Sequence, residues 1–247
     1  MKSSSFLPAT LFGMFLFCMV SCGEQNDQKD NETSDSMTND TTAATLTPAP
    51  SAIVTTPQHM MVVRHKVADF DKWLASYESR DSLRLANGIH SYVIGRGVTD
   101  PNMILVATKV DDIEKAKAFG KSADLKQAMQ KGGVTGKPDI RLTTMTYQDT
   151  GIISTDLRSR TTFTVKNWEN WQRSFDSSRQ VRLDNGLIDR AYGHEADDNN
   201  KVTVVVAVTD TAKANAFWKS DQLKQLRAGS GVTSEPERFL FRVVKRY

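Results

Sequence analysis

Two stretches of this sequence are nearly the same: "KSADLKQAMQKGGVTGKP" at Lys121–Pro138 and "KSDQLKQLRAGSGVTSEP" at Lys219–Pro236. The same offset aligns further pairs without an insertion: Trp73 with Trp171, Arg84 with Arg182, Asn87–Gly88 with Asn185–Gly186, and Phe119 with Phe217. An uninterrupted repeat of this kind predicts two units of roughly 90 residues, a usual size for a small domain. We place them at 59–148 and 149–247.

Each unit carries the same predicted order of elements. In the first unit, a helix begins after Asp69 with apolar residues spaced i, i+3, i+4 and i+7, and it ends at Asn87–Gly88. β-rich runs lie at 60–67, 89–96, 103–110 and 139–147, and Asp112 and Ser122 are typical caps for two further helices. The order is β-α-β-β-α-β, which is ferredoxin-like.

A single unit of this kind has helices on only one face of its sheet. The other face needs a cover, and the second unit of the same chain is the obvious one. We therefore predict an α+β fold in which two tandem ferredoxin-like units form an eight-stranded closed or nearly closed barrel with helices outside.

The segments "VRHKVADFDKW" (63–73) and "DPNMILV" (100–106), with the repeated stretch, resemble the dimeric α/β-barrel superfamily, specifically its antibiotic biosynthesis monooxygenase-like proteins. Members usually pair as homodimers, so the resemblance implies a single-chain pseudo-dimer that is a monomer. The group includes cofactor-free oxygenases of aromatic polyketides, haem-binding enzymes and isomerases. Its haem-degrading members have a histidine on the second helix, and residues 111–120 and 210–219 contain none. We expect no cofactor.

The amino-terminal residues predict where the protein is located in the cell. Lys2 precedes an apolar run at Phe6–Val20 that is too short to span a bilayer, and "MVSC" then resembles a bacterial lipobox ending at Cys22. We expect a lipoprotein signal peptide at 1–21, lipidation of Cys22 and anchoring in the bacterial cell envelope, on its periplasmic or outer-membrane face. An ordinary secretory signal cleaved near Ser21–Cys22 is the alternative, and the choice between inner and outer membrane stays open.

The segment 22–58 is rich in Asn, Asp, Thr, Ser and Pro, and it has six acidic residues against one lysine. Such a composition predicts a disordered acidic tether. The only cysteines are Cys18 and Cys22, which excludes disulfides and cysteine-ligated metals in the body. The four histidines show no metal-ligand spacing, so no metal is expected. The basic residues of the body form no block, which argues against nucleic acid as a partner.

Strand alternation selects candidate ligand-binding residues. On 89–96 one face carries His90, Tyr92, Ile94 and Arg96, and on the equivalent strand it carries Ile188, Arg190, Tyr192 and His194. The opposite face of the first strand is small or apolar and suits helix packing. We therefore predict that Tyr92, Arg96, Arg190, Tyr192 and His194 face the barrel interior and bind a ligand.

His65 and His90 are the candidate catalytic bases, because imidazole titrates near neutral pH. Arg96 or Arg190 would stabilise a developing oxyanion. The second unit has Phe163 in place of His65 and Ile188 in place of His90, so the fold needs neither histidine. Whether His65 or Arg64 faces the interior is left open.

Two classes of function follow. The first is a lipid-anchored envelope protein that binds a small hydrophobic, aromatic or anionic molecule in the barrel cavity. The second is a cofactor-independent, monooxygenase-like enzyme acting on a small aromatic or polyketide-like substrate.

Overall fold

The computed structural model describes residues 52–247. The elements run in the order β1(Ile53–Val54), β2(Gln58–Val67), α1(Phe70–Glu78), α2(Asp81–Ala86), β3(Ile89–Gly97), β4(Met103–Val110), α3(Ile113–Gly120), α4(Ala123–Lys131), β5(Val134–Asp149), β6(Leu157–Thr164), α5(Trp168–Ser177), α6(Arg179–Asp184), β7(Leu187–Glu195), β8(Asp198–Val208), α7(Thr211–Lys219), α8(Asp221–Gly229) and β9(Glu237–Arg246). We call β1–β5 with α1–α4 the first half, and β6–β9 with α5–α8 the second half.

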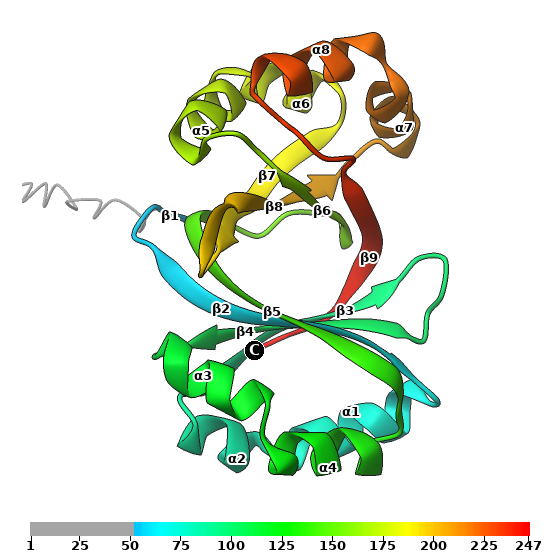
Figure 1. Cartoon of the computed structure of the whole chain (residues 1–247). Helices are drawn as coiled ribbons and strands as arrows, with labels where there is room; N and C mark the ends of the chain where they lie inside the picture. Colours follow the sequence, from blue (N-terminus) through cyan, green and yellow to red (C-terminus); the bar gives the residue numbers. More distant parts are fainter. Residues whose placement is uncertain (1–51) are drawn as a thin grey trace, which may run out of the picture. The chain divides into compact units, whose positions relative to one another are not determined.

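The strands form one antiparallel sheet that closes on itself. Its order is β1-β5-β2-β4-β3-β9-β6-β8-β7, and an additional pairing joins β5 to β7. Two seams therefore connect the halves: β5 with β7, and β3 with β9. Figure 1 shows α1–α4 on one outer side of this ring and α5–α8 on the other. The helices pack on the sheet through apolar clusters centred on Trp73 and Ile94 in the first half and on Trp171 and Phe217 in the second.

The helix predicted to run from Phe70 to Asn87 is two helices. Asp69 caps α1 by accepting a hydrogen bond from the Lys72 amide, as predicted. α1 ends at Glu78, and the hydroxyl of the next residue, Ser79, donates to the Ser76 carbonyl oxygen. Serine hydroxyls that bond back to the helix compete with its backbone hydrogen bonds, and α2 then starts without a side-chain cap. The second half breaks in the same place, between α5 and α6.

Two β-bulges interrupt the alternation of the strands that follow these helices. In β3, Ser91 pairs with Thr108 and Val93 with Ala107, so Tyr92 is the extra residue. In β7, Asp189 pairs with Val206 and Ala191 with Val205, so the extra residue is Arg190. A bulge reverses which side chains face each side of the sheet beyond it.

The ordered body begins earlier than predicted. The segment 22–58 was expected to be a tether, but Ile53–Val54 pairs with β5 opposite Asp149 and Gln148. The predicted signal peptide, Cys22 and most of the tether lie outside the described residues, so they stay predictions. Among residues 52–247, no helix is long and apolar enough to cross a membrane.

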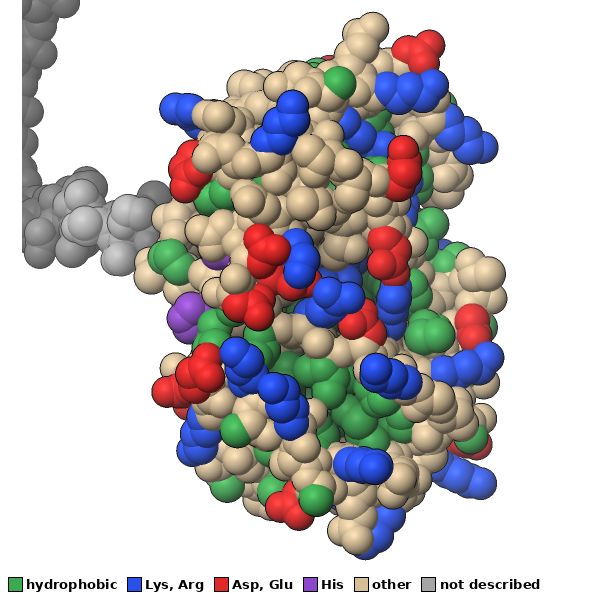
Figure 2. Space-filling view, viewed as in Figure 1, with side chains coloured by type: hydrophobic (Ala, Val, Ile, Leu, Met, Phe, Trp, Pro, Cys, Tyr) green, Lys and Arg blue, Asp and Glu red, His purple; other side chains and the backbone are tan. Residues whose placement is uncertain are grey.

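Figure 2 shows acidic and basic side chains intermixed over the visible face. Several of them form ion pairs across the strands, including Arg64 with Glu237 and Arg141 with Glu195, each at 2.7 Å. This intermixing leaves no continuous basic stripe on that face, in keeping with the scattered charges of the sequence.

Candidate functional site

Cavities lie on both sides of the closed sheet. The first helix-side pocket, between the sheet and helices of the first half, has a volume of about 80 Å³. The second helix-side pocket is its counterpart in the second half, with about 100 Å³. The barrel cavity, of about 90 Å³, is lined by all eight strands of the ring. Each is smaller than the roughly 300–1,000 Å³ of pockets for drug-sized ligands, so each suits a small molecule.

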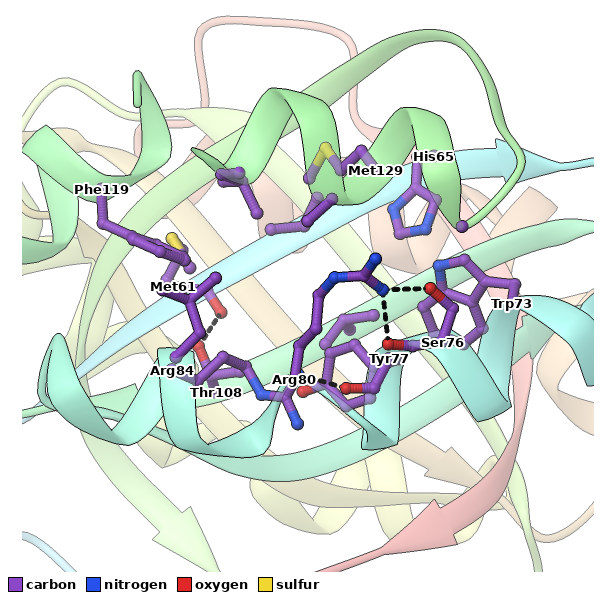
Figure 3. Close-up of a pocket in the computed structure, with 16 residues that line it drawn as sticks. Met61, His65, Trp73, Ser76, Tyr77, Arg80, Arg84, Thr108, Phe119 and Met129 are labelled. Atoms are coloured by element: carbon purple, nitrogen blue, oxygen red, sulfur yellow. Dashed lines mark hydrogen bonds between the residues drawn. The ribbon is translucent and has the colours of Figure 1, made fainter. Parts of the chain in front are cut away.

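The first helix-side pocket has a largely apolar lining with a few polar side chains (Figure 3). Its apolar wall includes Met61, Trp73, Phe119 and Met129. Its polar lining residues are His65, Ser76, Tyr77, Arg80, Arg84 and Thr108. Strands β2 and β4 and helices α1–α4 thus bring together residues that are far apart in the sequence.

His65 is the polar residue of this pocket that has no partner. Its side chain is buried, and neither ring nitrogen has a hydrogen-bond partner in the described part of the chain. The ring lies 5.3 Å from the Trp73 ring, centroid to centroid, in an apolar setting. Burial lowers the His65 pKa from 6.5 to about 4, because the charged imidazolium is poorly solvated there. His65 is therefore neutral at pH 7, with one nitrogen free to accept a proton.

Arg84 and Tyr77 form a fixed pair at the edge of the pocket. The Arg84 guanidinium lies 3.6 Å over the Tyr77 ring and donates to the Tyr77 carbonyl oxygen, to Ser91 Oγ and to Asp81 Oδ1. The Tyr77 hydroxyl and Ser91 Oγ are 2.8 Å apart. Burial raises the Tyr77 pKa, so its phenol stays protonated. Arg84 is itself buried, whereas the side chain of its only carboxylate partner in the described residues, Asp81, is 51% exposed.

Arg80 lies across the same pocket from the junction of α1 and α2. Its Nη1 donates to the Ser76 carbonyl oxygen at 2.9 Å and to the Ser76 hydroxyl. Figure 3 shows the Arg80 side chain between Tyr77 and the His65 end of the pocket. Arginine side chains are long and flexible, so movement of Arg80 would enlarge the space beside His65.

The second helix-side pocket is formed by the equivalent strands and helices of the second half, but its polar side chains differ. Phe163 stands in the place of His65, and Ser178 in the place of Arg80. Arg182 repeats Arg84, including a guanidinium 3.5 Å over a ring, here Phe175. Its partner, however, is the buried Asp189, which accepts from Nε at 2.7 Å and from Nη2 at 2.6 Å. The second pocket thus has no imidazole, and the charge of its Arg182 is neutralised.

The barrel cavity contains two of the predicted ligand-binding residues. Tyr92 and Arg190, the two bulged residues, both line it. Arg190 is buried and donates to Asp149 Oδ2 at 2.9 Å and to the Gly151 carbonyl oxygen at 2.5 Å. Two arginines that the sequence analysis did not select, Arg158 and Arg160 on β6, line the same cavity.

The other predicted ligand-binding residues do not face the barrel interior, and that part of the prediction is wrong. Arg96 lies over the ring of Phe70 on α1, 4.2 Å from its centroid. The Tyr192 hydroxyl donates to Asp176 on α5 at 2.7 Å, and the His194 ring lies 4.8 Å from the Trp168 ring on the same helix. These three residues follow the bulges, which turn them to the helix side.

The two candidate bases are not neighbours, because β4 separates β2 from β3. His65 faces the helices, and Arg64 is the one that points to the other side of β2, toward Glu237 and Phe239. The His90 side chain is exposed on β3, and its Nε2 is 3.0 Å from both carboxylate oxygens of Asp111. It lines none of the three cavities.

Sequence reasoning missed the polar residues of the first helix-side pocket other than His65. One signal was present: Arg84 and Arg182 occupy equivalent positions in both units, on helices that otherwise pack through apolar residues. A charge repeated in such a position indicates a buried, partnered arginine. The arginines on β6 had no such signal, since the first half has Met60 and Val62 in their places.

The residues of the helix-side pockets do not fit a haem. The only imidazole in the first pocket is His65 on β2, and α3 and α7 carry no histidine. Volumes of about 80 and 100 Å³ are also small for a porphyrin. Among residues 52–247, no three His, Cys, Asp or Glu side chains are placed to hold a metal ion.

The sequence matches no known protein family and no curated protein. Solved structures do resemble the fold. An anthrone oxidase-like protein aligns with a TM-score of 0.53 at 16% identity, over 79% of this chain and 95% of that one. A protein provisionally named a chlorite dismutase gives a TM-score of 0.51 at 11% identity, over 77% and 96% of the two chains.

A protein provisionally named a monooxygenase, from Fusobacterium nucleatum subsp. nucleatum, gives a TM-score of 0.50 at 12% identity, over 76% of this chain and 93% of that one. Identities this low show a shared fold and leave activity to other evidence. The comparisons and the strand pairing confirm the predicted α+β fold with an antiparallel sheet.

Proposed function

We propose that this chain binds a small aromatic molecule in the first helix-side pocket and acts on it as a monooxygenase-like enzyme without a cofactor. The observation that carries the proposal is His65: a buried imidazole that has no hydrogen-bond partner among residues 52–247, on the wall of an apolar cavity. We also infer that the two halves arose by tandem duplication, which makes the chain a fused pseudo-dimer.

The energetics of His65 favour a ligand as its missing partner. A buried polar group without a hydrogen bond costs about 1–3 kcal/mol. The fold does not require this cost, because Phe163 fills the equivalent position in the second half. A substrate hydroxyl or an acidic C–H group next to the ring would supply the partner, and the aromatic wall beside Trp73 suits a flat apolar body.

Neutral His65 can take a proton from such a substrate. Its low pKa makes it a weak base in the empty pocket, but the anion produced would stabilise the imidazolium, since charges interact strongly where water is excluded. Arg80 and Arg84 add positive charge to the same wall. Arg84 has no buried carboxylate to neutralise it in the described part of the chain, so it favours a developing oxyanion.

The reaction class is oxidation of an activated CH₂ group by dioxygen. His65 accepts the first proton, and the electron pair left on the substrate forms a C–O bond to dioxygen. The resulting peroxide anion takes the proton back from His65. Loss of the remaining hydrogen together with hydroxide then gives a carbonyl group and water, so both atoms of dioxygen are accounted for.

The test is oxygen uptake by the full-length chain with anthrone, which has an activated CH₂ group between aromatic rings. We expect uptake above the rate in buffer, and a loss of about 10²–10⁴-fold in the rate enhancement for His65→Phe. His90→Ala is the matched control: it removes an exposed histidine outside the three cavities, so it should keep the wild-type rate. A His65→Phe variant that oxidises anthrone as fast as the wild type would contradict the proposal.

Binding without turnover is the second candidate function. It is favoured by the weakness of His65 as a base and by the hydrogen bond that already engages the Tyr77 hydroxyl. With a lipid anchor at Cys22, such a pocket would capture its ligand outside the cytoplasm. Equilibrium dialysis separates the two candidates. Anthrone retained by the wild type but not by His65→Phe, with oxygen uptake no faster than in buffer, would support capture.

A further inference from the structure

The barrel cavity has two walls of different chemistry. On the first-half wall lie Met60, Val62 and Leu105, which are apolar and buried. Their equivalents on the second-half wall are Arg158, Arg160 and Thr203. The polar wall therefore stands where the same fold elsewhere accepts apolar residues, and packing alone does not require the two arginines.

Arg158 and Arg160 are both buried, with 3% and 8% of their surface exposed. They are two positions apart on β6, so their Cα atoms are about 6.8 Å apart and both side chains lie on the cavity side of the strand. Neither has a carboxylate within ion-pair distance among the described residues. Arg158 donates through Nη1 to the carbonyl oxygens of Thr155 and Leu157.

Arg160 is the less well partnered of the two. Its Nη2 makes a long hydrogen bond of 3.4 Å to Thr203 Oγ1, and its buried Nε has no partner within the part of the chain that the structure describes. Burial lowers the pKa of both Arg158 and Arg160 to about 10, because the low-dielectric interior penalises the charged form. At neutral pH both remain charged. The cavity therefore holds two cations that form no ion pair with a carboxylate in the described part of the chain; Asp156, Asp139 and Glu237 act on them only from beyond ion-pair distance.

The one carboxylate among the lining residues does not compensate them. Asp149 is already paired with Arg190. Arg246 adds a further positive charge at the exposed end of β9. An unpaired buried charge is strongly unfavourable, and a planar guanidinium is best compensated by a carboxylate that accepts two hydrogen bonds.

We propose that the barrel cavity binds a small organic carboxylate, whose carboxylate group is held by Arg160 and Arg158 and whose apolar part lies on Met60, Val62 and Leu105. This site is separate from the first helix-side pocket, on the opposite face of the sheet. An inorganic anion would satisfy the arginines but leave the apolar wall uncovered.

The test is titration of the full-length chain with benzoate at constant ionic strength, by calorimetry and by thermal unfolding. Benzoate should bind and raise the Tm of the wild type. Benzamide, which has the same shape without the charge, and inorganic phosphate should each bind at least tenfold more weakly. Equal binding of benzamide would overturn the role of the arginines, and equal binding of phosphate would overturn the choice of an organic ligand.

Arg160→Val and Arg158→Met install the residues of the first half, so both are compatible with the fold. Each should weaken benzoate binding at least tenfold. Arg160→Val without ligand should be at least as thermally stable as the wild type, because a buried unpaired charge is gone. Wild-type benzoate affinity in both variants, or no binding to the wild type, would overturn the proposal.

Two control variants separate this site from other effects. Lys126→Met removes an exposed positive charge from α4 and should leave benzoate binding unchanged, whereas a similar loss there would indicate a nonspecific charge effect and count against the site. His65→Phe should also bind benzoate normally. Loss of benzoate binding in His65→Phe would place the carboxylate in the helix-side pocket and overturn this proposal.

Discussion

The two helix-side pockets are built from equivalent elements, but they differ in how the charge of a buried arginine is balanced. Each holds a buried arginine over an aromatic ring, Arg84 over Tyr77 and Arg182 over Phe175. In the second half the buried Asp189 neutralises the arginine, while in the first half the equivalent residue is Ser91. The first half also has His65 where the second has Phe163.

Comparing the two pockets distinguishes residues that the fold requires from residues that are candidates for ligand binding. What both halves share, the arginine on its ring and the apolar cluster under the helices, belongs to the fold. Two features of the first pocket have no equivalent in the second and do not favour stability: an imidazole without a partner among the described residues, and an arginine whose carboxylate partner is exposed. The second pocket has a different unpartnered group, the buried Nε of Arg238. Residues retained in a less favourable arrangement are the ones we expect to meet a ligand.

The largest expected effect comes from removing the carboxylate that neutralises the buried arginine of the second half. Asp189→Ser gives this half the residue of the first and leaves Arg182 buried without a carboxylate. Removing one partner of a buried ion pair costs about 3–5 kcal/mol. Ser91→Ala should cost less, about 1–3 kcal/mol, since Arg84 keeps Asp81 and the Tyr77 carbonyl oxygen while the Tyr77 hydroxyl loses its partner. Urea unfolding measures both, and equal losses would show that the two arginines depend on their partners to the same degree.

The next effect is a pH dependence specific to the first half. The His65 pKa is about 4 in the folded chain and 6.5 when unfolded, so below pH 6.5 the unfolded chain binds a proton that the folded chain does not. The contribution of neutral His65 is therefore fully present above pH 6.5 and is lost as the pH falls toward 4. It amounts to about 3 kcal/mol at 1.36 kcal/mol per pKa unit.

His65→Phe should abolish this contribution. The free energy of unfolding of the wild type minus that of His65→Phe should fall by about 3 kcal/mol between pH 7 and pH 4, because the carboxylates common to both proteins cancel in the difference. Parallel pH profiles would mean that His65 is protonated as easily in the folded chain as in water.

The repeat in the sequence predicted more of the fold than of the site. Matching residues such as Trp73 and Trp171, with the helix start after Asp69, predicted the element order, because these features depend on local spacing. The faces of β3 and β7 depend on bulges at Tyr92 and Arg190, and a strict period of two does not reveal a bulge.

The bulges explain why some of the predicted ligand-binding residues line the barrel cavity while others face the helices. Tyr92 and Arg190 are the bulged residues themselves and line the barrel cavity, whereas Tyr192 and His194 come after a bulge and pack against α5. Arg158 and Arg160 could not be selected from the sequence, because alternation along β6 leaves open which side of the strand faces the interior. Closure of the ring settles that question, and it depends on the pairing of β3 with β9 and of β5 with β7 between the halves.

Gly95 and Gly193 are equivalent residues, one at each seam between the halves, and they give the last and smallest expected effect. A Cβ on Gly193 would lie 2.1 Å from the Thr144 carbonyl oxygen and 2.7 Å from the Met145 Cα, both in the backbone of β5. A Cβ on Gly95 would meet the Phe241 ring at 2.2 Å, and a side chain can move away where a paired strand cannot. Gly193→Ala should therefore cost about 1–3 kcal/mol and expose the β5–β7 amides to hydrogen exchange, while Gly95→Ala costs less and leaves the β3–β9 amides protected. Equal destabilisation with both seams intact would contradict this expectation. It would show that the backbone of β5 can shift as readily as the Phe241 ring to accommodate an added Cβ.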